Sequence, residues 1–169
     1  MNIMRRMLLF VIFVSAGLNL FSQSIADLDR DPSFKGIKIG DPISKYTNIL
    51  KYKGVRKGKN VYTITDQQYY SIFNVKMQEV VVVESNGKVW AILLSKSCGQ
   101  DLFNPKELET LKSSLEFRYN SPNLDLTDSS VPVAGYRWQA KNIILDIVYL
   151  FPYEGSKLQY FLYQREDDY

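Results

Sequence analysis

Histidine is absent from the sequence. Imidazole is the usual general base near neutral pH and a common ligand of zinc and copper, so its absence excludes Ser-His-Asp triads, Cys-His dyads and histidine-bearing metal sites. Cysteine is nearly absent: Cys98 stands alone, which excludes an intramolecular disulfide and a multi-cysteine metal site. We therefore expect no cofactor. Two interpretations of Cys98 stay open, a buried apolar residue or a thiol that reacts or links two molecules.

A strong excess of charge of one sign is also lacking. The chain has 21 Lys and Arg against 18 Asp and Glu, a formal net charge of +3. Two of the cations, Arg5 and Arg6, lie in the N-terminal segment, and without them the net charge falls to +1. Proteins that bind nucleic acids usually carry a clear positive excess, because phosphate contacts supply most of their affinity. The balance of charge argues against a nucleic-acid partner.

No apolar run is long enough to span a membrane. The longest, at residues 7–21, has about fifteen residues, whereas a helix needs roughly 20. Two arginines precede this run, and Ser22 and Ser24 follow it at the spacing of small residues that signal peptidase requires. We expect residues 1–24 to be a signal peptide that is cleaved after Ser24. Cleavage after Ser22 or Gln23 is the alternative.

Removal of that segment leaves residues 25–169, a usual size for a single domain. No cysteine lies near the cleavage point, so the new N-terminus has no acceptor for a lipoprotein anchor. We therefore expect a bacterial protein that is exported to the periplasm or out of the cell, with no membrane span in the mature chain.

The first half of the mature chain predicts one helix followed by strands. Residues 34–40 have the pattern of a short strand, and Asp41 and Pro42 are a typical helix start, which predicts a helix over residues 42–53. Its apolar residues recur at helical spacing: Ile43, Tyr46 and Leu50. Alternating patterns then predict strands, with an Asn86-Gly87 hairpin turn between the last two, at residues 61–65, 69–75, 77–84 and 88–95.

The second half shows the same order. Asn104 and Pro105 start a helix whose apolar stripe is formed by Leu108, Leu111 and Leu115, and which we expect to end by Asn120. Strands are predicted at residues 135–140, 142–151 and 157–164, with a turn at 152–155.

The predicted fold class is therefore α+β. The chain is expected to form two helix-then-antiparallel-meander units, at residues 34–98 and 104–165, with both helices packed on one face of an antiparallel sheet. The other face is then available to a partner.

A family resemblance supports this fold. The run F-K-G-I-K-I-G-D-P-I-S-K-Y at residues 34–46 resembles the opening of many uncharacterised exported bacterial domains. Further features in the second half, Leu108, Leu111, Leu115, Arg118-Tyr119, Pro122 and Trp138, are similar to the β-lactamase-inhibitor-protein-like fold, which includes small outer-membrane assembly lipoproteins. The resemblance implies a fold rather than a function. The chain departs from these families because it lacks the lipid-acceptor cysteine of the lipoproteins and the disulfides of the inhibitors.

A cluster of cations is the first candidate binding site. It places five cations within nine residues: Lys51, Lys53, Arg56, Lys57 and Lys59. One interpretation is a solvated loop between a helix and a strand. The other is a binding site for an anionic partner, a glycan or a lipid surface.

Aromatic residues form the second candidate, centred on Tyr69, Tyr70 and Phe73. Together with these, further aromatics could gather on the free face of the sheet: Tyr149, Phe151, Tyr153, Tyr160, Phe161 and Tyr163. Exposed aromatic patches are unusual on monomers, so such a patch would be a recognition surface or an oligomer contact; the alternative is that these rings form core.

The sequence favours binding over catalysis. Glu84 and Asp146 are the only carboxylates inside strand patterns that could form a glycosidase pair, and both also suit a strand end or a sheet surface. We expect a non-catalytic, exported binding module whose partner is a protein, of the inhibitor, immunity or envelope-assembly type. The alternatives are a carboxylate-based enzyme that acts on glycans and a carrier of a small apolar or anionic ligand.

Overall fold

The structure is a computed structural model that describes residues 24–99, 105–127, 133–150 and 156–166. Residues 1–23 of the expected signal peptide, the Asn104 helix start, the turn at 152–155 and the aromatic residues Phe151 and Tyr153 lie outside the described residues. No helix within the described ranges is both long and apolar enough to cross a membrane.

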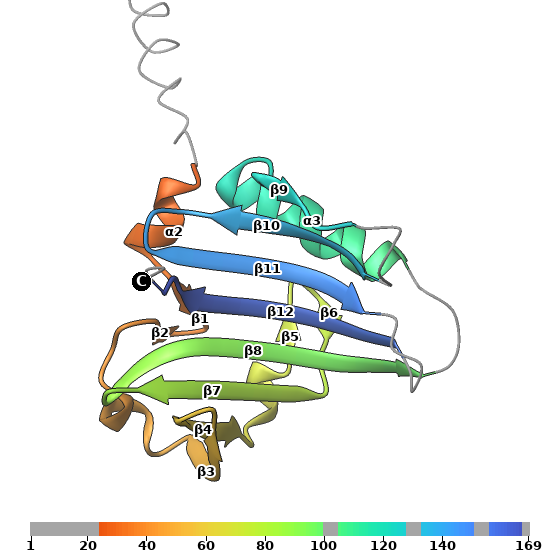
Figure 1. The fold of residues 1–169 in the computed structure, drawn as a ribbon. Helices are drawn as coiled ribbons and strands as arrows, with labels where there is room; N and C mark the ends of the chain where they lie inside the picture. Colours follow the sequence, from red (N-terminus) through yellow and green to blue (C-terminus); the bar gives the residue numbers. More distant parts are fainter. Residues whose placement is uncertain (1–23, 100–104, 128–132, 151–155, 167–169) are drawn as a thin grey trace, which may run out of the picture.

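One antiparallel sheet dominates the structure (Figure 1). Its eight strands lie in the order β3 (Leu50–Arg56), β4 (Lys59–Ile64), β7 (Glu79–Ser85), β8 (Lys88–Gly99), β12 (Ser156–Gln164), β11 (Ile143–Leu150), β10 (Val133–Gln139) and β9 (Leu124–Asp125).

Two of its hairpins have turn residues with positive φ angles. The β7–β8 turn has φ values of 52° at Asn86 and 76° at Gly87, and the β3–β4 turn has 48° at Lys57 and 75° at Gly58. Two consecutive positive φ angles are the signature of a type I′ turn, whose twist matches that of the flanking strands. The hairpin predicted at Asn86-Gly87 is confirmed.

One face of the sheet is covered. The helix α3 (Pro105–Tyr119) packs on β10 and β11, and α2 (Ala26–Arg30) contacts α3 and β11. Two small hairpins contribute core residues on the same face, β1 (Ser33–Phe34) with β2 (Ile37–Lys38) and β5 (Ser71–Ile72) with β6 (Val75–Lys76). In Figure 1, α3 and the β5–β6 hairpin lie behind the sheet.

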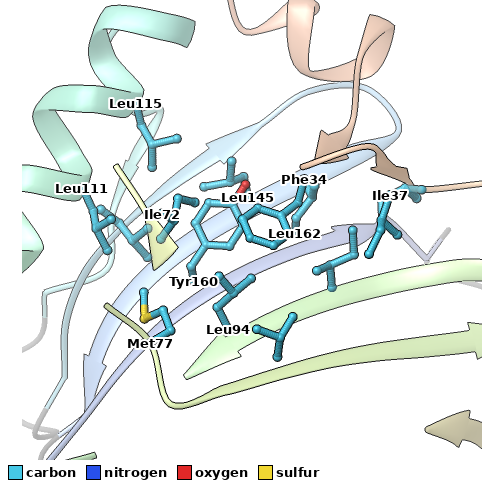
Figure 2. Packing of buried hydrophobic residues seen from close by; sticks show 14 of the residues in the cluster. Phe34, Ile37, Ile72, Met77, Leu94, Leu111, Leu115, Leu145, Tyr160 and Leu162 are labelled. Carbon is cyan, nitrogen blue, oxygen red and sulfur yellow. The ribbon is translucent and has the colours of Figure 1, made fainter. Parts of the chain in front are cut away.

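The core lies between these elements and the sheet (Figure 2). Leu111 and Leu115 of α3 meet Ile72 of β5, Tyr160 of β12 and Leu145 of β11, and all five are at most 8% exposed. The predicted stripe of α3 is confirmed. The helix ends at Tyr119, and the next residue, Asn120, adopts the left-handed conformation that terminates helices.

The prediction of two helix-then-meander units is wrong, because the helix expected at residues 42–53 does not form. Residues Ile43–Tyr46 make a single 3-10 turn, η1, and Leu50–Arg56 are strand β3. The protein is mostly β, and α3 is the only α-helix of more than two turns among the residues that the structure describes.

Long-range hydrogen bonds explain this difference. The Gly40 N–H donates to the Val89 carbonyl oxygen at 2.8 Å, and the Val89 N–H donates to the Asp41 carbonyl oxygen at 2.9 Å. The segment before η1 is thus bound to the β7–β8 hairpin in extended form. The Tyr46 hydroxyl donates to the Gly36 carbonyl oxygen, 3.1 Å away, which turns the chain back on itself. Spacing along the sequence could not reveal these contacts.

The two halves also share one sheet instead of forming separate units. Strand β12, near the C-terminus, pairs with β8 from the first half, so the two strands lie together at the centre of the sheet. The strand expected at residues 69–75 is broken as well: Phe73 and Asn74 have φ values of 46° and 67° and form the turn between β5 and β6.

Candidate functional site

The open face of the sheet, opposite α3, carries two rows of side chains that follow from the strand register. One row runs Thr63, Val81, Leu93, Phe161 and Asp146 across β4, β7, β8, β12 and β11. The neighbouring row runs Val61, Val83, Ala91 and Tyr163. Because side chains alternate between the faces of a strand, these residues lie on the face that the core does not use.

A groove of about 770 Å³ lies on this open face; we call it the basic groove. It is lined by Lys53, Arg56, Lys57, Lys59, Val61, Thr63, Glu79, Val81, Val83, Trp90, Leu93, Phe161 and Glu166. Its volume is within the range of about 300–1,000 Å³ that is typical of small-molecule sites.

The floor of the basic groove is apolar. Valine and leucine side chains from three strands line it together with Phe161. Thr63 is a polar floor residue, but its hydroxyl donates to the Val80 carbonyl oxygen at 3.2 Å. Trp90 lies at the irregularity where β7 and β8 shift register, since Ala91 pairs with Val83 and Val89 with Glu84. Trp90 is the residue of β8 that has no partner on β7, and its ring lines the groove.

The rim of the groove is cationic. The β3–β4 hairpin supplies all four cations, and its register shifts between Tyr52 and Gly54, which has a φ of 128°. The Lys59 ammonium is 2.8 Å from the Glu166 carboxylate and 4.5 Å from the centre of the Trp90 ring. Of the predicted cluster, only Lys51 does not line the groove.

Three of these cations, Lys53, Arg56 and Lys57, have no carboxylate partner within the described part of the chain. Two carboxylates also line the groove: Glu166, which pairs with Lys59, and Glu79, which accepts a hydrogen bond from Ser95 at 3.2 Å. Among the residues that the structure describes, the rim therefore carries more positive than negative charge, and Lys53, Arg56 and Lys57 are available to an anion.

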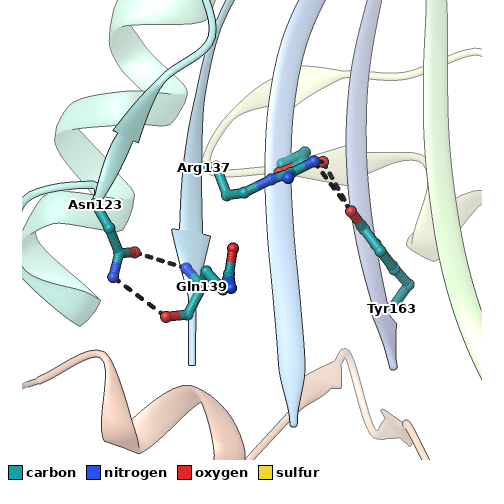
Figure 3. Close-up of polar contacts among 5 residues, drawn as sticks. Asn123, Arg137, Gln139 and Tyr163 are labelled. Carbon is teal, nitrogen blue, oxygen red and sulfur yellow. Dashed lines mark hydrogen bonds and ion pairs between the residues drawn. The ribbon is translucent and has the colours of Figure 1, made fainter. Parts of the chain in front are cut away.

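A polar network continues the open face beyond the groove (Figure 3). The Arg137 guanidinium binds the Asp146 carboxylate through two bonds of 2.7 and 2.8 Å, and the Tyr163 hydroxyl lies 3.2 Å from both groups. The pKa of Arg137 is raised chiefly by the hydrogen bond to Asp146. Burial, followed by the negative charge of Asp146, raises the pKa of Tyr163 to about 12. At neutral pH the network holds one ion pair and a neutral tyrosine.

This network predicts a loss of stability at alkaline pH. The pKa of Tyr163 is higher in the folded chain than its ordinary value of 10.0, so the folded state binds the proton more tightly. The stabilisation is complete below pH 10 and declines as the pH rises from about 10 to about 12. Between pH 10 and 12 the free energy of unfolding should fall in both proteins, and we expect it to fall by about 1–2 kcal/mol less in Tyr163→Phe than in the wild type. Urea unfolding at a series of pH values measures this difference, and identical slopes for both proteins would contradict it.

The predicted aromatic site is not on the open face. Tyr69, Tyr70 and Phe73 pack against the core on the covered face, where the Tyr70 hydroxyl donates to the Ile64 carbonyl oxygen at 2.7 Å. Tyr69 also contacts the Phe34 ring, with centroids 6.5 Å apart. The structure thus does not bring these aromatics together with the cations.

The other aromatics divide between the faces. Tyr149 and Tyr160 are buried in the core, whereas Phe161 and Tyr163 stack on the open face with centroids 4.4 Å apart. Trp90 lies 6.1 Å from Tyr163. The open face therefore has an aromatic cluster, although it differs from the one that the sequence indicated.

The two candidate catalytic carboxylates lie on opposite faces of the sheet. Asp146 is opposite Phe161 on the open face, whereas Glu84 follows the open-face residue Val83 and points to the other side. Glu84 accepts a hydrogen bond from the Gly87 N–H at 2.6 Å and another from the Asn60 side chain. A glycosidase pair must flank one bond, so these two residues cannot form such a pair.

Sequence reasoning missed the floor of the groove. The signal was present: residues 80–83 are four consecutive valines, which is typical of a strand with apolar contacts on both faces. Val80 and Val82 are fully buried in the core, and Val81 and Val83 line the groove. Trp90 could not be assigned, because an ideal strand alternation does not include the register shift.

Cys98 is partly buried against the core near the end of β8. The residues described by the structure contain no group of three acidic or cysteine side chains that could hold a metal ion. The resemblance to the inhibitor-protein-like fold stays a prediction. No family model, no curated protein and no solved structure matches this chain.

Proposed function

We propose that this chain is an exported, non-catalytic binding protein that holds an anionic partner in the basic groove. One observation carries the proposal: an apolar floor lies beside three cations, Lys53, Arg56 and Lys57, that have no carboxylate partner in the described ranges. All three cations are exposed, and they border the apolar floor.

The electrostatics of the groove support an anion. Apolar walls exclude water and lower the local dielectric constant, so a charge held near the rim is attracted more strongly than it would be on a flat, solvated surface. The Glu166 carboxylate at Lys59 is an internal example of the kind of group that the rim accepts. An acidic protein segment and a small anionic ligand both satisfy this requirement.

Charge reversal of the rim tests the proposal. We expect the triple variant Lys53→Glu, Arg56→Glu, Lys57→Glu to bind its partner at least about tenfold more weakly, because each substitution replaces attraction with repulsion. Proteins and lipids from an envelope extract of the producing cell are captured on the immobilised wild-type and variant chains and quantified by mass spectrometry.

The matched control changes the net charge equally at exposed lysines that do not line the groove: Lys76→Glu, Lys141→Glu, Lys157→Glu. This variant should retain the same molecules as the wild type. If both triple variants lose them equally, net charge rather than the groove determines binding, and the proposal is wrong.

Export has its own test. The expectation of cleavage rests on the two arginines, the apolar run and the small residues Ser22 and Ser24. We expect the protein recovered from the producing cell to have the mass of residues 25–169. A recovered mass equal to that of the full 169 residues would contradict the proposal of a cleaved signal.

A further inference from the structure

We propose that the occupant of the basic groove is one free, long-chain carboxylate, with its alkyl chain on the apolar floor and its carboxylate at the cations of the β3–β4 hairpin. This inference rests on the proposed function and names the chemistry of the ligand. It follows from what the floor lacks, from where the charge lies, and from the size of the groove.

The floor offers nothing to a peptide backbone. Its side chains are Val61, Val81, Val83, Leu93 and Phe161, and the hydroxyl of the remaining floor residue, a threonine on β4, already donates to a carbonyl oxygen. The backbone groups beneath these side chains are paired within the sheet. A peptide on this floor would bury N–H and C=O groups without partners, which is unfavourable. An alkyl chain has no such groups.

The positive charge lies on one side of the floor only. All four rim cations come from the β3–β4 hairpin at one edge of the sheet, whereas the floor extends across β7 and β8 to Phe161 on β12. A ligand that fits this arrangement has an anionic end and an apolar remainder. Lys59 already holds the carboxylate of Glu166 at 2.8 Å, so the geometry for a carboxylate exists at the rim.

The groove is matched to a single molecule rather than to a bilayer. Its volume of about 770 Å³ corresponds to one small ligand. The floor residues Val81, Val83 and Leu93 are only partly exposed and lie within the sheet, on β7 and β8, whereas a surface that inserts into lipid would project such residues outward. The side chains of Tyr52 and Val55 on the β3–β4 hairpin are 55% and 60% exposed. Binding to lipid vesicles is therefore measured as a separate experiment.

Calorimetric titration with laurate, below the concentration at which it forms micelles, tests the inference directly. We expect saturable binding of one laurate per chain and a change in the fluorescence of Trp90, which lines the groove. Trp138 is fully buried on the covered face, and the variant Trp138→Phe identifies the responding ring because it should keep both the binding and the fluorescence change.

Matched compounds separate the contributions of charge and chain. Butyrate has the charge without the chain, and dodecyltrimethylammonium has the chain with the opposite charge, so both should bind at least about tenfold more weakly than laurate. A decapeptide of glutamate should also bind more weakly. Equal binding of the cationic detergent, or tighter binding of the acidic peptide, would overturn the inference.

Two variants of the protein complete the test. The rim variant Lys53→Glu, Arg56→Glu, Lys57→Glu and the floor variant Leu93→Gln should each weaken laurate binding by about tenfold or more, whereas the control variant at Lys76, Lys141 and Lys157 should not. Binding to anionic vesicles that persists in the floor variant, without saturable laurate binding, would show that the partner is a lipid surface and overturn the inference.

The failure of this inference can be distinguished from the failure of the proposed function. If laurate does not bind but the rim variant still loses the molecules captured from the envelope extract, the ligand class is wrong and the groove remains a binding site. If the rim variant retains those molecules and laurate does not bind, both proposals are wrong.

Discussion

Replacing Trp138 with alanine is expected to lower the free energy of unfolding by about 3–5 kcal/mol. The Trp138 side chain is fully buried between the sheet and α3. Its indole N–H donates to the Asn120 carbonyl oxygen at 2.7 Å, which fixes the C-terminal end of α3 to β10. The substitution therefore opens a large cavity and removes the hydrogen bond that joins helix and sheet.

Urea unfolding monitored by far-UV circular dichroism measures this loss. Trp138→Phe retains most of the apolar area and lacks the donor, so its cost should be closer to about 1–2 kcal/mol. The matched control is Trp90→Ala, because Trp90 is only partly buried on the open face and should cost less than Trp138→Ala. Equal losses for the two alanine variants would contradict the assignment of Trp138 to the core.

Gly135→Ala is expected to destabilise the protein by about 3 kcal/mol, although alanine is normally the better strand residue. Gly135 lies in β10 opposite Val148 of β11. A Cβ atom at this position would overlap the Ile147 carbonyl oxygen and lie 2.8 Å from Val148 Cγ1. Because the oxygen belongs to the backbone, β10 must move away from β11 to admit the methyl group.

The control for this prediction is Gly58→Ala in the β3–β4 turn. No atom lies within 4 Å of an added Cβ there, and the cost comes only from the φ of 75°, about 1–2 kcal/mol. Thermal unfolding of both variants compares the two costs. If Gly135→Ala is neutral or stabilising, the close approach of β10 and β11 described here is incorrect.

Local patterns predicted those elements whose hydrogen bonds are also local. The apolar stripe of α3, the end of this helix by Asn120 and the Asn86-Gly87 turn all depend on neighbours in sequence, and all were found as predicted. The helix predicted over residues 42–53 does not form, because distant contacts override the local pattern. The apolar spacing suits a helix, but the backbone of residues 40–43 is bound to the distant β7–β8 hairpin.

The candidate site shows a similar division. The cation cluster was evident because its members lie within nine residues, and the β3–β4 hairpin keeps four of them together at one groove. The aromatic candidate was misplaced, because the face on which Tyr69, Tyr70 and Phe73 lie depends on a turn at Phe73 and Asn74 that has positive φ angles without glycine. Such turns carry only a weak signal in the sequence.

The sequence by itself excluded several kinds of site: without histidine and with one cysteine, no Ser-His-Asp triad, intramolecular disulfide or histidine-bearing metal site can form, whatever the fold. It also determined that the cations would stay together. Only the tertiary structure decided what they border. The floor of the basic groove comes from β4, β7, β8 and β12. The pairing of β12 with β8 joins two strands that are separated in sequence by α3, β9, β10 and β11. Register between distant strands depends on the whole sheet, so no local pattern could place Phe161 beside Leu93.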